Sequence, residues 1–472
     1  MIKSMPLSRP YTRWALCVTL AATLAACSSP TPYRRPAIDL PKLSGSTAQP
    51  AQDLTPIAWE TLYADERLKA LIRTALQRNP DVRMALARME ESRALWGVQR
   101  ADQVPNVALG ASHTNSSIPP MVQGSNPAAI NTHRYDVGLN LLAFELDLWG
   151  RVASLTQAAK LSYQASEEDR RTVRMGLVND VANAYFALLE SQQRQRLLEQ
   201  TERSRLEVLG LTQRKRDVGA ASDYDVALTQ AAWQTARSDS LALQRQTEQA
   251  QNALNLLLGG APAPDLPPGL ALERQSLDLP WGANLSSEVL LKRPDVIAAE
   301  KRLQAAHANI HAARVAFLPR LQLTSLAGTA SPSLSGLFTG TSRNWNFVPS
   351  LQQPIFDGGR TRSGVDLAQA RENQAVVAYE KTLQQAFREV ADLLVARDTL
   401  KQQLASQQEV LQSQSQRRRL VELRLKQGAV SQLEWLDAER ETWQAEQSVA
   451  LIQRQLLATI AQLFKALGGG DL

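Results

Sequence analysis

The sequence predicts an α+β membrane protein made of two copies of one unit, each with one β-hairpin and one long helical hairpin. The first observation is an internal repeat, because Asn79-Pro80-Asp81-Val82 returns 214 positions later as Arg293-Pro294-Asp295-Val296. The spacing then becomes 209 positions, as between Gly150-Arg151 and Gly359-Arg360. A repeat of about 210 residues is longer than a solenoid unit of roughly 20–50 residues, so it indicates a duplicated domain. The second observation is that the pattern of apolar residues changes at the same point in both copies. It alternates every second residue, as in a strand, before this point and has helical spacing after it.

Within the first copy, residues 80–102 are predicted to form a helix, and residues 107–112 and 135–141 alternate as strands do. The turn-rich loop 116–131 lies between these strands, so the three segments predict a β-hairpin. The matching helix, strand, loop and strand of the second copy are 294–317, 321–326, 328–342 and 345–351. The five-residue difference between the copies falls in this connection, as expected of an exposed loop.

A long helical hairpin follows in each copy. Residues 151–218 and 361–427 contain no Pro, and such a helix is about 100 Å long. Turns at Gly219-Ala220 and Gly428-Ala429 are predicted to send a second helix back, to Gly259 and Gly468 respectively. The predicted N-caps of these returning helices are Ser222 and Ser431. The predicted apolar seam of the first long helix consists of Val178, Val181, Tyr185 and Leu188.

The long helices are too polar in the middle for an ordinary bundle. Residues 191–196 and 412–419 leave little room for a broad apolar face. We expect a wall one helix thick with water on both sides; the alternative is an exposed antiparallel coiled coil that encloses no lumen. Two hairpins supply only four strands, and an open sheet edge cannot lie in lipid. A trimer would supply twelve strands.

The N-terminus predicts a secreted chain. Three cations precede a short apolar run over residues 14–24, which is the pattern of a signal peptide. The run ends in Leu24-Ala25-Ala26-Cys27, which resembles a bacterial lipobox and makes Cys27 a candidate for diacylation; the alternative is an ordinary signal peptide with a chance Cys. Ser28 after this Cys is typical of lipoproteins sent to the outer membrane. Cys17 would leave with the signal, so no internal disulfide is expected.

Charge and hydropathy exclude other classes. The formal net charge of +6 falls to about +3 without the signal peptide, and the Arg residues alternate with Glu and Gln, so no nucleic-acid partner is predicted. No later window reaches the roughly 18 consecutive apolar residues of a spanning helix, so a membrane span must be β. No phosphate-binding loop, nucleophile–base pair or CxxC motif is present. We therefore expect no enzyme activity and no cofactor.

Four motifs carry a family resemblance. They are Leu142 to Arg151, Leu285 to Asp295, Pro354 to Arg360 and Leu433 to Arg440. In this order they resemble the TolC/NodT-type outer-membrane factors, the outer-membrane lipoproteins of resistance-nodulation-division efflux systems, and the resemblance covers nearly the whole chain.

The resemblance implies a homotrimer with a 12-stranded transmembrane β-barrel continuous with a periplasmic α-helical barrel. It implies a location in the cell outer membrane, in contact with its lipid and extending into the periplasm. Its partners would be a periplasmic adaptor protein and an inner-membrane pump of the resistance-nodulation-division class. The implied function is the exit duct of a tripartite efflux pump, which passively exports small molecules such as drugs. Alternatives are an exit duct for type I protein secretion or heavy-metal export, and a lipid-anchored coiled-coil scaffold without a pore.

The predicted domain boundaries follow the repeat. They are a signal peptide at 1–26, a lipid-anchored and equatorial segment at 27–78, a first repeat at 79–260, a Pro-rich equatorial link at 261–292 and a second repeat at 293–469. The equatorial belt would draw on residues 59–71, 261–281 and the C-terminus.

The resemblance also implies the site residues. The turns Val218-Gly219-Ala220 and Gln427-Gly428-Ala429 match the periplasmic tips where an adaptor docks; the alternative is a simple tight turn. Glu434 and Asp437 match an acidic pair at the closed entrance of some members, and Asp225 matches an acidic position in the first copy. Glu434 and Asp437 would share one helix face and form a threefold ring; alternatively, they only complement a helix N-terminus.

Three further sets of residues carry expectations of their own. Leu425 and Val430 stand where the family has Tyr and Arg partners for the position of Asp225, so a latch would use other groups. His307 and His311 are spaced as on one helix face, but no third ligand is evident, so a polar face is expected rather than a metal site. Trp345, Phe347 and Tyr135 are candidates for anchors at the lipid interface or for ordinary strand aromatics.

Overall fold

A computed structural model describes residues 32–38, 58–118, 130–277 and 287–469. The chain forms two compact units, of which unit 1 comprises 1–37, 89–166 and 298–379, and unit 2 comprises 38–88, 167–297 and 380–472. Cys27, the motif start at Leu285 and most of the predicted loop 116–131 lie outside the described residues.

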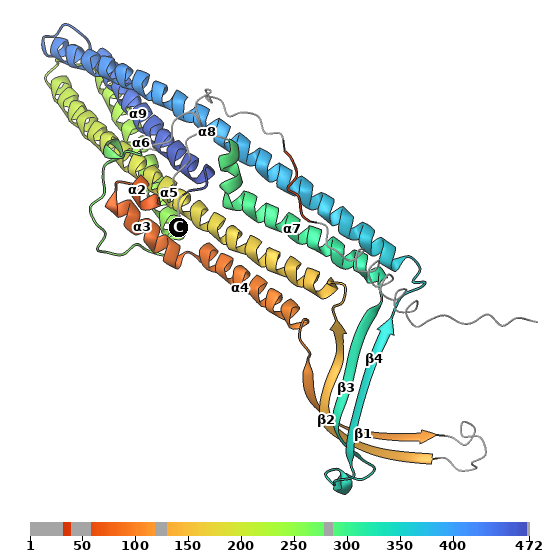
Figure 1. Cartoon of the computed structure of the whole chain (residues 1–472). Coiled ribbons are helices and arrows are strands. Elements are labelled where there is room, and N and C mark those ends of the chain that lie inside the picture. Colours follow the sequence, from red (N-terminus) through yellow and green to blue (C-terminus); the bar gives the residue numbers. More distant parts are fainter. Residues whose placement is uncertain (1–31, 39–57, 119–129, 278–286, 470–472) are drawn as a thin grey trace, which may run out of the picture. The chain divides into compact units, whose positions relative to one another are not determined.

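The elements follow the predicted order (Figure 1). In the first copy they are α2 (Trp59–Leu62), α3 (Glu66–Arg78), α4 (Pro80–Ala101), β1 (Val107–Ile118), β2 (Ile130–Leu146), α5 (Arg151–Asp217) and α6 (Asp223–Leu257). After the short 3₁₀ turns η2 (Leu272–Arg274) and η3 (Ser287–Lys292), the second copy contains α7 (Pro294–Arg314), η4 (Val315–Phe317), β3 (Arg320–Ser331), η5 (Leu334–Gly336), β4 (Arg343–Gln352), α8 (Arg360–Lys426) and α9 (Gln432–Ala466). The predicted protomer of two β-hairpins and two long helical hairpins is confirmed.

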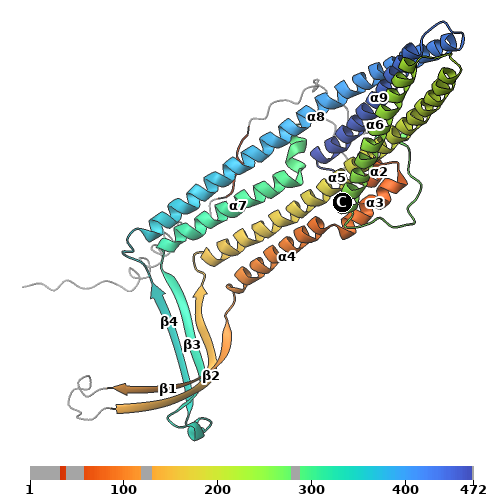
Figure 2. The same cartoon turned by 180° about the vertical axis from the view of Figure 1, so that it is seen from behind.

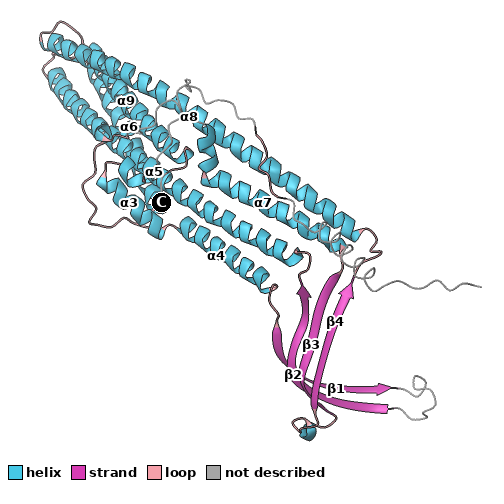
Figure 3. Cartoon of the chain, in the orientation of Figure 1, coloured by secondary structure: helices cyan, strands magenta, loops and turns pink. Residues whose placement is uncertain are grey.

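The strands of unit 1 form one antiparallel sheet in the order β1-β2-β3-β4 (Figure 3). The two hairpins are therefore joined by pairing between β2 of the first copy and β3 of the second. The register places Leu109 opposite Leu139, and Ala327 opposite both Leu139 and Trp345. All three strand pairs thus keep these positions on one face, since alternate residues of a strand point the same way.

The predicted loops were too long. Ser116 to Ile118 belong to β1, and Gly328 to Ser331, which were expected in the second loop, belong to β3. Pairing with β2 explains the second correction, because Gly328 faces Gly138 in the register. These two glycines allow β2 and β3 to approach each other closely, since a Cβ on Gly328 would overlap the Val137 carbonyl oxygen. A turn-rich composition therefore concealed a strand.

The long helices agree with the predicted ranges to within a residue or two. Both α5 and α8 contain 67 residues, and both α6 and α9 contain 35. The helix predicted over 294–317 ends earlier, because α7 stops at Arg314 and a 3₁₀ turn follows. No helix among the described residues has the length and apolar character needed to cross a membrane.

The core of unit 2 joins the expected seam of α5 to segments distant in the sequence. Val181 and Tyr185 are buried, and they pack with α2, α3, the link residue Leu272 and the C-terminal end of α9. The seam therefore does not serve helix pairing alone. It also packs against residues from the segments 59–71 and 261–281, which were predicted to contribute to an equatorial belt.

Asp65 is the polar centre of this core and is 1 % exposed. Its carboxylate accepts hydrogen bonds from the Tyr185 hydroxyl at 2.9 Å, the Leu270 amide at 2.9 Å and the Gln275 side chain at 2.6 Å. It also caps α3 by accepting from the amides of the first turn. Burial raises the pKa of Tyr185, and the Asp65 charge adds to this effect, so the phenol stays protonated and able to donate. One buried carboxylate thus ties α3, α5 and the link together.

Candidate functional site at the helical turns

The turn between α5 and α6 is a helix C-terminus closed by glycine. Gly219 has φ +74°, a conformation that glycine adopts without strain. The Gly219 amide donates to Arg216 O at 2.8 Å and the Ala220 amide to Lys215 O at 2.7 Å. These two bonds form a Schellman motif, which satisfies the last carbonyls of α5.

The turn between α8 and α9 repeats this geometry. Gly428 has φ +73°, its amide donates to Leu425 O at 3.0 Å, and the Ala429 amide donates to Arg424 O at 2.9 Å. Two turns 209 positions apart therefore share one backbone design. Basic residues precede both glycines and complement the negative end of each helix dipole.

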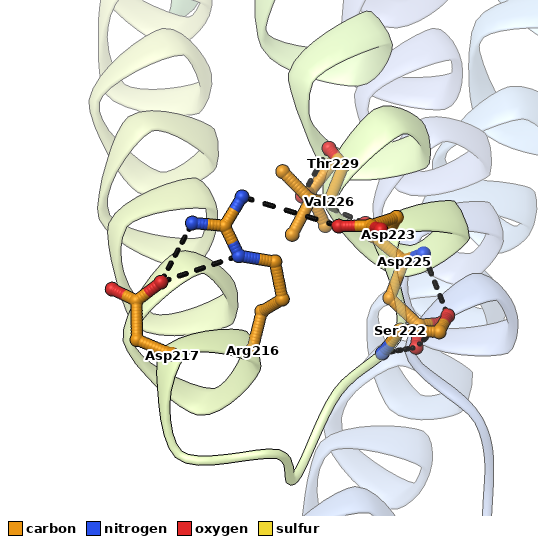
Figure 4. Close-up of polar contacts among 7 residues, drawn as sticks. All are labelled: Arg216, Asp217, Ser222, Asp223, Asp225, Val226 and Thr229. Atoms are coloured by element: carbon orange, nitrogen blue, oxygen red, sulfur yellow. Dashed lines mark hydrogen bonds and ion pairs between the residues drawn. The ribbon is translucent and has the colours of Figure 1, made fainter.

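The returning helices begin at the predicted N-caps, but the two caps differ. In the first copy, Ser222 Oγ accepts from the Asp225 amide at 3.1 Å, while the Asp225 carboxylate accepts from the Ser222 amide at 2.9 Å and its hydroxyl at 2.7 Å (Figure 4). These bonds form a capping box and hold the pKa of Asp225 below its ordinary value. In the second copy, Ser431 Oγ accepts from the Glu434 amide at 3.3 Å.

The three predicted gate carboxylates consequently have different surroundings. Asp225 is committed to its cap, Glu434 is exposed, and Asp437 is half-exposed on the next turn of α9. Asp437 forms an ion pair with Arg440 at 2.8 Å. Thus Glu434 and Asp437 share the start of α9, as their spacing predicted, while Asp225 belongs to α6. Their role in a gate remains a prediction.

Leu425 and Val430, which replace the expected latch partners, are both half-buried near the second turn. The first turn instead carries an ionic contact between its two helices. Arg216 of α5 lies 2.6 Å from Asp217 and 4.0 Å from Asp223 at the start of α6 (Figure 4). This contact connects neighbouring helices within one copy.

A buried ion pair further along α9 has no signal in the sequence. Glu439 is 8 % exposed and lies 3.6 Å from Arg205 of α5. Burial raises the pKa of Glu439, although Arg205 opposes this effect. These residues are more than 200 positions apart, and each resembles the other solvated charges of its helix, so only the fold identifies them as partners.

Exposed apolar side chains lie near both turns, and among them only Val218 had been predicted as a site residue. Val218 is 78 % exposed and Tyr224 is 71 % exposed beside the first turn, while Leu423 and Leu433 are 51 % and 53 % exposed beside the second. Contiguous patches of solvent-exposed apolar residues are typical of a protein contact surface. We call the turn residues 218–220 and 427–429, with these neighbours, the tip surface.

The two helical histidines have separate partners in unit 1. His307 Nδ1 lies 2.6 Å from a Glu372 oxygen of α8, whereas His311 Nδ1 lies 3.0 Å from Ser154 Oγ of α5. These contacts fit the polar helix face expected from the sequence. In the described part of the chain, no three His, Cys, Asp or Glu side chains gather as metal ligands would.

Comparisons with known proteins identify the family. The model of the family described as "Outer membrane efflux protein" matches residues 71–260 and 285–469, one stretch in each copy. Outer membrane protein OprJ of Pseudomonas aeruginosa is 40% identical over 457 residues, which are 96% of this chain and 94% of that protein. The toluene efflux pump outer membrane protein TtgC of Pseudomonas putida is 39% identical over 87% of this chain and 85% of its own length.

A solved structure agrees with these matches. The open state of the MtrE outer membrane channel of Neisseria gonorrhoeae superposes with a TM-score of 0.83 at 35% identity, over 94% of this chain and 98% of that one. The fold, the duplicated family match and the similar relatives therefore agree, and the chain belongs to the outer membrane efflux protein family.

Proposed function

We propose that three copies of this chain form the outer-membrane exit duct of a tripartite efflux pump, which lets small molecules such as drugs leave the cell passively. The observation that carries this proposal is the sheet of unit 1. Its exposed apolar side chains Leu109, Leu139 and Trp345 lie on one face, in one cross-strand row with Ala327. The next row on that face contains Val107 and Phe347, which are also exposed.

The opposite face of the sheet carries more polar side chains. The intervening row contains Asn140 and Asn346, on either side of Leu326. Apolar residues on one face and polar residues on the other are the pattern of a transmembrane β-barrel wall around a water-filled lumen. In the described residues, β1 and β4 are the two edges of the sheet. Joining three such sheets edge to edge would close a 12-stranded barrel.

Arginine substitutions test which face meets lipid. Trp345→Arg with Phe347→Arg places charges on the apolar face, whereas Asn346→Arg places one on the polar face of the same strand. Arginine on a lipid-facing position costs about 2–4 kcal/mol near the bilayer midplane. We expect the double variant to be lost from the outer-membrane fraction and Asn346→Arg to remain there. Equal recovery of both variants would argue against a barrel wall.

Export is tested in cells. Deleting the gene should increase the intracellular accumulation of pump substrates, and the wild-type gene should restore export. Scanning susceptibility to antibiotics, dyes and metal ions would show the substrate class, because restoration confined to metal ions would favour heavy-metal export. Unchanged accumulation of every compound would contradict the exit-duct proposal.

The tip surface is proposed as the adaptor-docking site, on the strength of its exposed apolar residues and paired Schellman turns. A photo-crosslinking residue at Val218 or Leu423 should capture the periplasmic adaptor. The same residue at Gln408, an exposed α8 position 15 residues before Leu423, is the control. Equal capture at all three positions would argue against a dedicated surface.

Cys27 is proposed as the lipid-bearing residue, because the lipobox ends there. Metabolic labelling with palmitate should mark the wild-type chain but not Cys27→Ala. Labelling of the variant would contradict the assignment.

A further inference from the structure

Two adjacent apolar side chains stand exposed in unit 1, between the end of β4 and the start of α8. Ile355 is 98 % exposed and Phe356 is 93 % exposed, the two highest values among the large hydrophobic residues that the structure describes. The next residue, Asp357, accepts hydrogen bonds from the amides of Gly359 and Thr361 at 3.0 and 2.8 Å, which ties this segment to the start of α8. Exposed apolar groups that lie together mark a contact with another protein or with a membrane.

The internal repeat shows what lies beside the equivalent position of the first copy. Leu146 precedes Ile355 by 209 positions, and Val107 precedes Leu321 by 214 positions, the two spacings of the repeat. Leu146 lies opposite Leu321 where β2 pairs with β3, and it is 39 % exposed. Inside the chain, the end of the first copy's second strand therefore meets the beginning of the second copy's first strand.

The two strands that correspond to β2 and β3 across the repeat are β4 and β1, and they are the edges of the sheet in the described part of the chain. β4 runs toward α8 and β1 runs away from α4 (Figures 2 and 3). β4 of one copy and β1 of the next can therefore pair antiparallel, as β2 and β3 do. Transferring the β2–β3 register to this joint places Ile355 of one copy opposite Val107 of the next.

The transferred register also fits the lengths of the two edge strands. Tyr135 lies opposite Ser331 at the other end of the β2–β3 pairing. The equivalent residues at the joint are Asn344 of β4 and Ser117 of β1. β4 has 10 residues and β1 has 12, so this register keeps the whole of β4 alongside β1.

The side chains at the joint are more apolar than those at the equivalent place inside the chain. Within the chain, Trp149 Nε1 donates a hydrogen bond to Pro319 O at 2.7 Å. In the second copy Gly358 stands where the first copy has this tryptophan, and Phe356 stands where the first copy has Asp147. A polar contact inside the chain is thus replaced by an apolar side chain that meets nothing within the same chain.

We infer that Ile355 and Phe356 pack against residues 104–107 of the neighbouring copy, with Ile355 opposite Val107. The receiving surface is apolar too, since Val104 and Val107 are 59 % and 58 % exposed. Removing these side chains from water favours the contact. The inference rests on the edge-to-edge assembly of the proposed function, and it adds the register of the joint and the side chains that seal it.

Paired cysteines test the register in the full-length protein in its membrane. Residues that lie opposite each other in an antiparallel pair have Cα atoms about 4.5–5.5 Å apart, a distance that a disulfide can span. Ile355→Cys with Val107→Cys should therefore convert most chains into covalent trimers on mild oxidation, and a reductant should release them. Ile355→Cys with Ala111→Cys is the matched control, because four residues along β1 add about 13 Å. The control and the wild type, whose own cysteines are Cys17 and Cys27, should stay monomeric on a denaturing gel.

A photo-crosslinking residue tests the partner without relying on disulfide geometry. Benzoylphenylalanine in place of Phe356 should capture a second copy of the chain. The same substitution at Phe338, which is 78 % exposed in the loop between β3 and β4, should not. Capture of lipid alone at Phe356 would overturn the inference, because the side chain would then face the membrane. Equal disulfide formation by both cysteine pairs, or none by either in a protein that remains trimeric, would overturn the register.

Current recordings separate this joint from the proposed function. Trimers that are crosslinked through Ile355→Cys with Val107→Cys and insert into a bilayer without passing current would contradict the channel and leave the joint standing. Discrete channel currents from a protein in which that pair never crosslinks would have the opposite meaning: the channel would stand and the joint would be wrong.

Discussion

Arg440 follows Asp437 by about one helical turn on α9, and its Nη2 atom lies 2.8 Å from Asp437 Oδ1. The predicted acidic pair is therefore unequal, because Asp437 has a cationic partner and Glu434 is exposed. The first copy is different again, since Asp225 is engaged in a capping box with Ser222. If three chains gather these residues around an axis, Glu434 carries most of the uncompensated charge.

Removing this pair tests the gate. Glu434→Ala with Asp437→Ala should raise conductance and lower the preference for cations, because mutual repulsion and cation attraction are both lost. Arg440→Ala should increase the preference for cations, because it removes the positive charge that is paired with Asp437. Reversal potentials across a salt gradient measure both effects.

Glu422→Ala is the matched control for the gate. Glu422 is paired with Lys426 on α8, and its side chain is 49% exposed against 47% for Asp437. If Glu434→Ala with Asp437→Ala changed the current no more than this control, the pair would be ordinary surface charge.

Asp65 should be the most sensitive polar position of unit 2. Asp65→Ala leaves the buried Tyr185 hydroxyl without its acceptor and removes an acceptor of the Leu270 amide and the Gln275 side chain, which costs about 3 kcal/mol or more. Asp265→Ala, at an exposed position of the same link, should stay within about 0.5 kcal/mol of the wild type. Thermal unfolding of the purified protein compares them. A similar melting temperature for both variants would show that the hydrogen-bond cluster is dispensable.

Gly328 should resist substitution. A Cβ there would overlap Val137 O and Gly138 Cα, so Gly328→Ala should cost about 1–3 kcal/mol as overpacking. By contrast, Gly97→Ala adds a Cβ into open space within α4 and should stabilise the chain by about 0.5–1 kcal/mol. Heat resistance on gel electrophoresis ranks the three proteins, and the opposite order would mean that β2 and β3 approach less closely.

Glu446 should make stability depend on pH. Burial raises the pKa of Glu446 above its ordinary value of 4.5, and the charge of Arg418 opposes this effect. The folded state therefore holds this proton more tightly than the unfolded chain, so stability falls as pH rises from below 4.5 through the folded pKa. Glu446→Gln should raise the melting temperature at pH 7 and have little effect at pH 4. A stabilisation independent of pH would contradict this cause.

Local patterns predicted most of the fold. Alternation identified the four strands, the lack of Pro identified the long helices, and Gly219 and Gly428 marked turns whose positive φ the structure confirms. The strand residues Gly328 to Ser331 were misassigned to a loop, because their pairing with β2 decides their conformation and their composition does not reveal it.

The features that pattern reasoning missed depend on residues far apart in the sequence. Asp65 meets Tyr185 and Gln275 only after folding, and Arg205 meets Glu439 in the same way. Asp65, Arg205 and Glu439 each resemble the other charged residues of their own segments, so the sequence alone contains no local signal for these contacts.

The central claim is that this chain forms an aqueous channel. Purified protein, shown to be trimeric, should be added to planar lipid bilayers and its current recorded at constant voltage. The proposal predicts discrete, uniform current steps, whose size increases in Glu434→Ala with Asp437→Ala. An intact trimer that inserts into the bilayer and passes no current, in the wild type and in this variant alike, would contradict it.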